Sequence, residues 1–339
     1  MSYEDDSKMM SVSCPRNRIV WVDILRGFCM LAILWFHTEF YYAGEDIIPY
    51  AMYVGDILAV FFFLSGYVTR YNIDSNYRKM LYSVLRWLVV PYLVFTSLIA
   101  LPKALLYHSF SGIVPIITHI LIGQASWFVC ALIVSKLIYI VILRLLKPSI
   151  RTLSYSAIVS LLLSAIVGNS LSPWHNAVDF WCVNEALLGY SLTIGGIIFR
   201  RYEHHIVRYV FNIWGILTLT ALLFVAKFLI ISINGQMVFG PLIVTDYPLF
   251  VADLLVAVLL IVGLFRRIPR WSFAEWVGRR SIVYYFLCGG CPVVISMLLR
   301  RFGFSYSHYL QIPIAYLLVV ILATSLVYLI YRYTNIVRY

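Results

Sequence analysis

Two side chains with useful chemistry stand in one apolar run of the sequence. The run DILRGFCMLAILWFHTEFYY, residues 23–42, contains Arg26 and His37. Because a helix turns by about 100° per residue, eleven steps bring these side chains to within about 20° of the same face, about 16 Å apart along the axis. Asp23 reaches the same face, whereas Glu39 points elsewhere near the other end of the run.

This pair combines an anion-binding group with a proton acceptor. A guanidinium binds phosphate or carboxylate oxygens through parallel hydrogen bonds. An imidazole, with an ordinary pKa of about 6.5, can take the proton of an attacking hydroxyl near neutral pH. Ionisable groups are costly in lipid, so we expect this face to turn towards protein or water. A second interpretation also fits this helix alone: Arg26 pairs with Asp23 at the membrane boundary, and His37 is an ordinary interior histidine.

The composition indicates the class of protein that must position these groups. Of 339 residues, 62% are hydrophobic and 12% are charged, against roughly 25% charged in soluble domains. The mean hydropathy is +0.89. These values predict an all-α, polytopic membrane protein. Residues 1–18 are polar and no small-residue cleavage site follows the first apolar run, so we expect a cytoplasmic tail at 1–18 and a single transmembrane domain at 19–339.

Ten apolar stretches are long enough to be transmembrane helices, which need about 20 residues. The segment at 110–122 is too short and is expected to lie at the membrane interface. The ten stretches are 19–42, 51–70, 81–101, 125–146, 152–168 (short and serine-rich), 177–199, 209–233, 247–265, 281–299 and 309–331.

The distribution of positive charge orients these stretches. Of 26 Lys and Arg residues, the loops on one side hold only Lys103, Arg300 and Arg301, and four more lie within or beside spans: Arg26, Arg86, Lys136 and Lys227. All the others fall in the alternate loops and the termini. By the positive-inside rule both termini face the cytoplasm, in a multi-pass protein of the inner (cytoplasmic) membrane. The net charge of +11 is thus explained by topology, and nucleic acid is not an expected partner.

Neither the cysteines nor the other motifs predict a metal site. Cys288-Gly-Gly-Cys291 has a redox-like spacing, but it lies inside a predicted helix, where small residues are typical of helix contacts. No paired Cys-x-x-Cys set, His-x-x-x-His motif or glycine-rich phosphate loop occurs in the sequence.

Five phrases occur in order along the chain. They are Arg26 and His37 separated by ten residues, FFFLSGY at 61–67, Arg86 followed by LVVPYLVF, SWFVCALIV from Ser126, and GRRSIVYYFL at 278–287. In this order they resemble acyltransferase family 3, membrane-bound acyltransferases that include many polysaccharide O-acetyltransferases. Two positions depart from the family pattern. Ser83 stands where many members have the first Arg of Arg-x-x-Arg before the third helix, and Cys288 stands where many have a late His.

The resemblance implies transfer of an acyl group, usually acetyl from acetyl-CoA, to a carbohydrate hydroxyl. His37 would act as general base or transient acyl carrier, and Arg26 would position the donor. The acyl-CoA would bind from the cytoplasm with its phosphates near Arg78, Lys79 and Arg86, and with Tyr92 and Trp127 lining the site. The carbohydrate acceptor would meet Glu39, Tyr41 and Ser65. No metal cofactor is implied.

Several alternatives stay open. Trp127 at a helix start is also typical of an interfacial anchor. Lys136 is either a buried functional cation or a snorkelling one, and Lys227 is expected to snorkel. Asp179, Glu185 and Asp253 are intramembrane acids without an assigned partner.

A membrane transporter or flippase for a glycan or small solute is the alternative function. Transporters often contain paired broken helices in two repeated halves, which this sequence does not show. A structural scaffold fits poorly with Arg26 and His37 on one apolar helix. The sequence leaves the acceptor, the acyl group and the oligomeric state open.

Overall fold

The fold is a bundle of apolar helices, which confirms the predicted all-α membrane class. The computed structural model describes residues 18–69, 71–72, 76–107, 113–168 and 180–334. Eight helical segments in this part of the chain are long and apolar enough to cross a membrane. They are α1 (Val20–Tyr42); α3 (Tyr77–Val84), the π-helical turn η2 (Leu85–Val89) and the first part of α4 (Val90–Tyr107); α6 (Trp127–Leu146); α7 (Ile150–Gly168); α8 (Val183–Tyr209); α9 (Ile213–Ile233); α10 (Tyr247–Phe265); and α14 (Gln311–Tyr333).

Shorter elements complete the fold. The segment predicted at the membrane interface forms the nine-residue helix α5, and two short strands pair as an antiparallel hairpin between α9 and α10. The bounds of these elements are η1 (Tyr50–Met52), α2 (Val54–Tyr67), α5 (Ile113–Leu121), η3 (Gln124–Ser126), η4 (Phe180–Cys182), β1 (Met237–Val238), β2 (Ile243–Val244), α11 (Ser272–Gly278), α12 (Ser281–Leu287) and α13 (Gly290–Arg301).

The predicted helix at 281–299 is broken at the Cys288-Gly-Gly-Cys291 phrase. α12 ends at Leu287, α13 begins at Gly290, and their axes are bent by 43°. Two consecutive glycines followed by Pro292 weaken the helix at this point, because glycine is flexible and proline cannot donate to the preceding turn. Counting this pair as one span gives nine in the described chain. The predicted number of ten is reached only if α2, with 14 residues, crosses as well.

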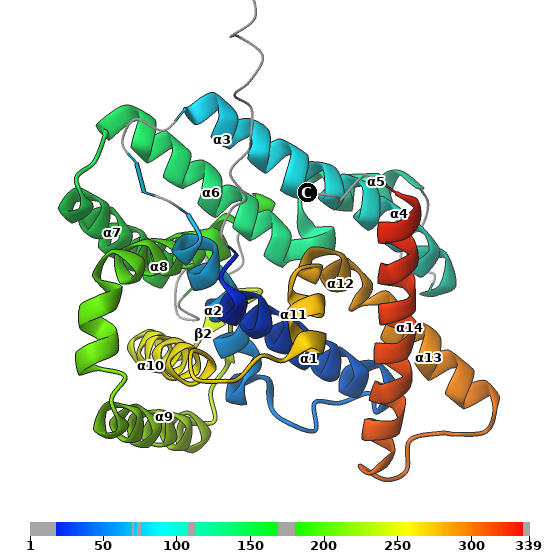
Figure 1. Ribbon diagram of the computed structural model, residues 1–339. Coiled ribbons are helices and arrows are strands. Elements are labelled where there is room, and N and C mark those ends of the chain that lie inside the picture. The colour runs from blue at the N-terminus through cyan, green and yellow to red at the C-terminus, as the bar shows by residue number, and fades with distance from the viewer. Residues whose placement is uncertain (1–17, 70, 73–75, 108–112, 169–179, 335–339) are drawn as a thin grey trace, which may run out of the picture.

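Helix α1 lies in the interior of the bundle, while α9 and α14 lie at its edges (Figure 1). It packs most extensively along α11. Gly27 makes this possible, because a Cβ atom there would lie 1.9 Å from the carbonyl oxygen of Ala274. The glycine that follows Arg26 therefore allows the two backbones to touch, which fixes the position of Arg26 along the bundle.

The FFFLSGY phrase packs α2 against α8. Phe62, Phe63 and Leu64 are buried, and a Cβ atom on Gly66 would lie 1.7 Å from the carbonyl oxygen of Thr193 on α8. The ring of Phe62 meets Phe128 of α6 at 5.1 Å. This phrase, recognised in the sequence as a family feature, thus forms a packing seam beside α1.

Candidate active site

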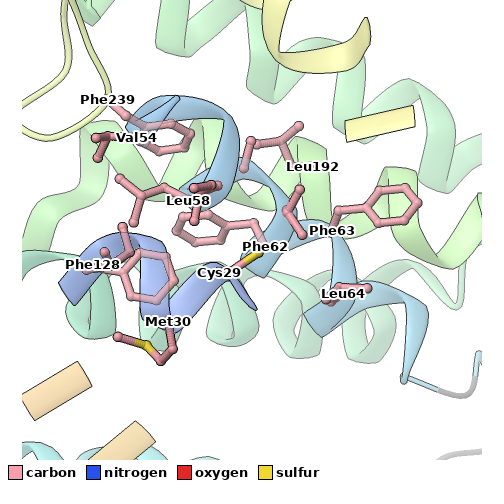
Figure 2. Close-up of a cluster of buried hydrophobic side chains, with 14 of the residues drawn as sticks. Cys29, Met30, Val54, Leu58, Phe62, Phe63, Leu64, Phe128, Leu192 and Phe239 are labelled. Atoms are coloured by element: carbon pink, nitrogen blue, oxygen red, sulfur yellow. The ribbon is translucent and has the colours of Figure 1, made fainter. Parts of the chain in front are cut away.

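The stripe of α1 that carries Arg26 and His37 faces the protein interior. Met30 and Ile33 lie between them on the same face, and they are 1% and 4% exposed. In the buried cluster of Figure 2, Met30 lies with Phe128 of α6, and Cys29 lies with Phe62 of α2. Arg26 and His37 are themselves half-buried. The inward orientation expected from the cost of ionisable groups in lipid is therefore present.

A second cation lies beside Arg26. The Lys136 ammonium donates to the carbonyl oxygen of Ser65 at 3.0 Å and to Oγ1 of Thr69 at 2.9 Å. Its charge is close enough to that of Arg26 for the two to repel each other. Lys136 is half-buried, and its ammonium is held at the end of α2. Two neighbouring positive charges inside an apolar bundle favour the presence of an anion between or beside them.

Asp23 binds an arginine outside α1. Its Oδ2 lies 3.5 Å from Nε of Arg279, which also pairs with Glu275 of α11. The charge of Arg26 also acts on Asp23. The ion pair formed by Asp23 is thus with Arg279, and it ties α1 to the end of α11.

At the other end of the stripe, His37 lies among aromatic rings. Its imidazole stacks on the ring of Tyr41, one turn later, with centroids 6.1 Å apart and planes 18° apart. Phe36 meets the imidazole edge-on at 5.4 Å. The carbonyl oxygen of Tyr41 accepts hydrogen bonds from Ser296 at 2.7 Å and from Arg300 at 3.2 Å. Tyr41 therefore connects the surroundings of His37 to α13.

Glu39 stabilises the loop that follows α1. It is 1% exposed, and its carboxylate accepts Nε1 of Trp35 at 2.5 Å and the backbone N–H of Ile48 at 3.4 Å. Its role in acceptor binding stays a prediction, as do those of Tyr41 and Ser65. The contact seen at Ser65 is the one between its carbonyl oxygen and Lys136.

The residues predicted to hold the donor are spread over the bundle. Arg78, Lys79 and Arg86 are exposed on α3 and η2, and Nη1 of Arg86 donates to Tyr82 one turn earlier at 3.5 Å. Tyr92 is fully buried and donates to the carbonyl oxygen of Ile120 at 2.6 Å. Trp127 is half-buried, and its ring lies 6.0 Å from Phe239 in the hairpin segment. Lys136, whose role the sequence had left open, is held at the end of α2 by Ser65 and Thr69.

Lys227 forms an interior ion-pair triad, so the snorkelling prediction was wrong. Its ammonium lies 2.8 Å from Oδ2 of Asp56 and 2.7 Å from Oδ2 of Asp253, and it donates to the carbonyl oxygen of Ala51 at 2.9 Å. Asp56 and Asp253 are 5% and 2% exposed. The sequence contained a signal for this triad, because an intramembrane Lys and two intramembrane Asp residues each need a partner.

Glu185 and Asp179 are the other two acids that the sequence placed within the membrane. Glu185 is buried and accepts the backbone N–H of Leu242 at 2.9 Å, which ties α8 to the hairpin segment. Asp179 lies outside the described residues. No group of three or more His, Cys, Asp and Glu side chains within the described ranges could hold a metal ion.

The stripe on α1 thus joins a cationic end, made of Arg26 and Lys136, to a base near the opposite end of the helix. Such an arrangement suits a reaction in which an anionic carrier docks at one end and a proton is removed at the other.

Comparison with known proteins gives one match. A family model described as an acyltransferase domain matches residues 19–332, nearly the whole chain. No curated protein and no solved structure matches it.

Proposed function

This chain belongs to acyltransferase family 3, and from that membership we propose that it transfers an acyl group, usually acetyl, from a cytoplasmic acyl-CoA to a hydroxyl of a carbohydrate. The helices make it a multi-pass membrane acyltransferase. The acyl-CoA donor, the carbohydrate acceptor and the role of His37 are the parts that we propose. In this proposal the acceptor is a surface polysaccharide, an exopolysaccharide or a precursor of one.

The observation that supports it most is the inward stripe of α1. Arg26 and His37 are about 16 Å apart along the helix axis at 1.5 Å per residue, which is about the length of a pantetheine arm. Lys136, whose ammonium is held by Ser65 and Thr69 at the end of α2, would add a second donor for the phosphates at this end. An acyl-CoA whose phosphates stay near the cytoplasmic end could therefore extend its thioester towards His37.

His37 would act on the acceptor hydroxyl. In the general-base route its unprotonated ring nitrogen takes the hydroxyl proton while the oxygen attacks the thioester carbonyl carbon. The carbon–sulfur bond then breaks, the acyl group stays on the acceptor oxygen, and the imidazolium returns its proton to the departing CoA thiolate. In the acyl-carrier route the imidazole nitrogen attacks first, the carbon–sulfur bond breaks, and the ring N–H proton goes to the departing CoA thiolate. The acceptor oxygen then displaces the imidazole, which takes up the hydroxyl proton.

The test measures acyl transfer and CoA release by the purified chain in lipid nanodiscs, with labelled acetyl-CoA and candidate glycans. We expect His37→Gln to lower the rate by about 10²–10⁴-fold, the usual contribution of a general base. His205→Gln, at an exposed position on α8, is the matched control. Transfer by His37→Gln at the control rate would refute the role of His37.

Two further measurements separate the alternatives. If label stays on the protein when the acceptor is omitted, His37 acts as an acyl carrier. If no label stays on the protein and turnover with the acceptor is normal, His37 acts as a general base. Movement of a glycan across proteoliposomes without CoA release would instead support the transporter. For Arg26→Gln we expect a raised apparent KM for the donor, whereas loss of activity with unchanged donor affinity would indicate a structural ion pair.

A further inference from the structure

A basic pocket lies where α8 extends past the apolar part of the bundle. Its volume is about 670 Å³. The lining consists of seven residues, six on α8 and one at the end of α10: Arg200, Arg201, Glu203, His204, Val207, Arg208 and Arg266. Four of the seven are arginines, so the pocket concentrates positive charge on the side predicted to face the cytoplasm.

The single acidic residue of this lining is already engaged. Glu203 pairs with Arg266, and its carboxylate oxygens accept the hydroxyl of Tyr67 at 3.0 Å. Arg200 donates from Nη1 to the carbonyl oxygen of Tyr67 at 2.9 Å. Glu203 therefore compensates Arg266 and leaves the charges of the other three arginines without an acid in the lining.

Two of these arginines lie at exposed positions of the lining. Arg201 and Arg208 are exposed, and neither has an ion pair with a carboxylate in the part of the chain that the structure describes. α8 is kinked at Tyr202, so Arg201 lies before the kink, whereas His204 and Arg208, four residues apart, share one face of the helix after it. All three line the pocket. An anion bound between Arg201 and Arg208 would offset the positive charge that these two guanidinium groups bring to the pocket.

The pocket borders the N-terminal end of α1. The ring of Tyr67 lies 5.0 Å from the ring of Trp21, and the guanidinium of Arg266 lies 5.2 Å from the same ring. Trp21 precedes Arg26 by five residues, about 7.5 Å along the axis. Tyr67 is the last residue of FFFLSGY, so this phrase connects the packing seam of α2 to the basic pocket.

We propose that this pocket binds the phosphate group of an organic anion. Arginine is suited to this task, because its planar donors match phosphate oxygens in pairs. Two sources carry the same chemistry: the phosphates of the acyl-CoA and the headgroup of an acidic phospholipid. Binding of the acyl-CoA phosphates rests on the proposed function, whereas binding of an acidic phospholipid headgroup does not.

The test uses the full chain in nanodiscs and needs no turnover. CoA and inorganic pyrophosphate are titrated against the wild type in phosphatidylcholine, and retained lipid is measured in phosphatidylcholine mixed with phosphatidylglycerol. We expect the double variant Arg201→Gln, Arg208→Gln to weaken binding by about tenfold or more, the change expected when one charge-assisted hydrogen bond is lost. Arg151→Gln, at an exposed position at the start of α7, is the control and should bind as the wild type does.

The pattern of losses identifies the source. Weaker binding of CoA and pyrophosphate supports the nucleotide, and loss of retained phosphatidylglycerol alone supports the lipid. Unchanged binding of all three probes, in a double variant that has the wild-type thermal midpoint, overturns the proposal. If the double variant does not fold, Arg201→Lys replaces it and should weaken binding, because lysine cannot form the paired contact. Failure of the proposed function would appear separately, as wild-type protein that binds pyrophosphate but transfers no acyl group.

Discussion

Replacing Lys227 by methionine should destabilise the protein strongly. The substitution keeps the apolar stem but removes the ammonium that lies 2.8 Å from Asp56 and 2.7 Å from Asp253. Both carboxylates are almost fully buried, so water cannot replace the lost partner. Breaking a buried ion pair by removing one member costs about 3–5 kcal/mol, because it leaves buried charge uncompensated.

The assay is thermal unfolding of the purified protein in detergent, followed by the loss of the monodisperse peak. We expect Lys227→Met to lower the midpoint by several degrees. Lys147→Met, at an exposed position after α6, controls for the loss of one positive charge. Adding Asp56→Asn to Lys227→Met should recover part of the loss, since it removes one of the two stranded carboxylates.

The midpoints of Lys227→Met and Lys147→Met are compared to decide whether the triad stabilises the protein. A midpoint for Lys227→Met equal to that of Lys147→Met would mean that the triad contributes nothing to stability. A double variant less stable than Lys227→Met would show that the two carboxylates do not repel each other once the lysine is gone. Either result would refute the reasoning from burial and charge.

Three further outcomes follow from the surroundings of α1. Gly27→Ala should abolish the yield of folded protein on size-exclusion chromatography, because its Cβ would lie 1.9 Å from a carbonyl oxygen of α11. The control Gly195→Ala should leave that yield unchanged, because its Cβ would meet no neighbouring atom within 4 Å. Lys136→Met should raise the apparent KM for acyl-CoA more than it lowers kcat, and an unchanged KM in the transfer assay would contradict a donor role. Trp35→Phe should lower the unfolding free energy by about 1–3 kcal/mol, since the buried carboxylate of Glu39 loses the shorter of its two hydrogen bonds. An unchanged urea midpoint would show that the carboxylate finds another partner.

The sequence predicts the helices well because bilayer thickness sets their length. Each of the ten apolar stretches contains helix in the described structure, and the inward face of α1 follows from helical periodicity and the cost of ionisable groups in lipid. The break between α12 and α13 was missed, although Gly289, Gly290 and Pro292 marked it. Hydropathy averages over such residues, so an apolar run is read as one continuous helix.

Partners across the bundle are harder to predict, because they depend on which helices become neighbours. Lys227 and Asp253 are 26 positions apart, and Asp56 is far from both in sequence. Without a helix order, Lys227 is most simply placed at the membrane surface. Lys136 is a similar case, since its hydrogen bond to Ser65 exists only because α6 passes the end of α2. The site residues on other helices therefore remain predictions, and only the α1 stripe follows from local geometry.

The attachments of α1 have a consequence for how the protein can move. At one end Gly27 touches the backbone of α11 and Asp23 holds Arg279, and at the other the carbonyl oxygen of Tyr41 is held by α13. Sliding α1 by one turn, about 5.4 Å, would break all these attachments at once. The position of His37 is thus fixed relative to α11 and α13. We expect any opening that admits or releases large molecules to involve movement of other helices around α1, α11 and α13.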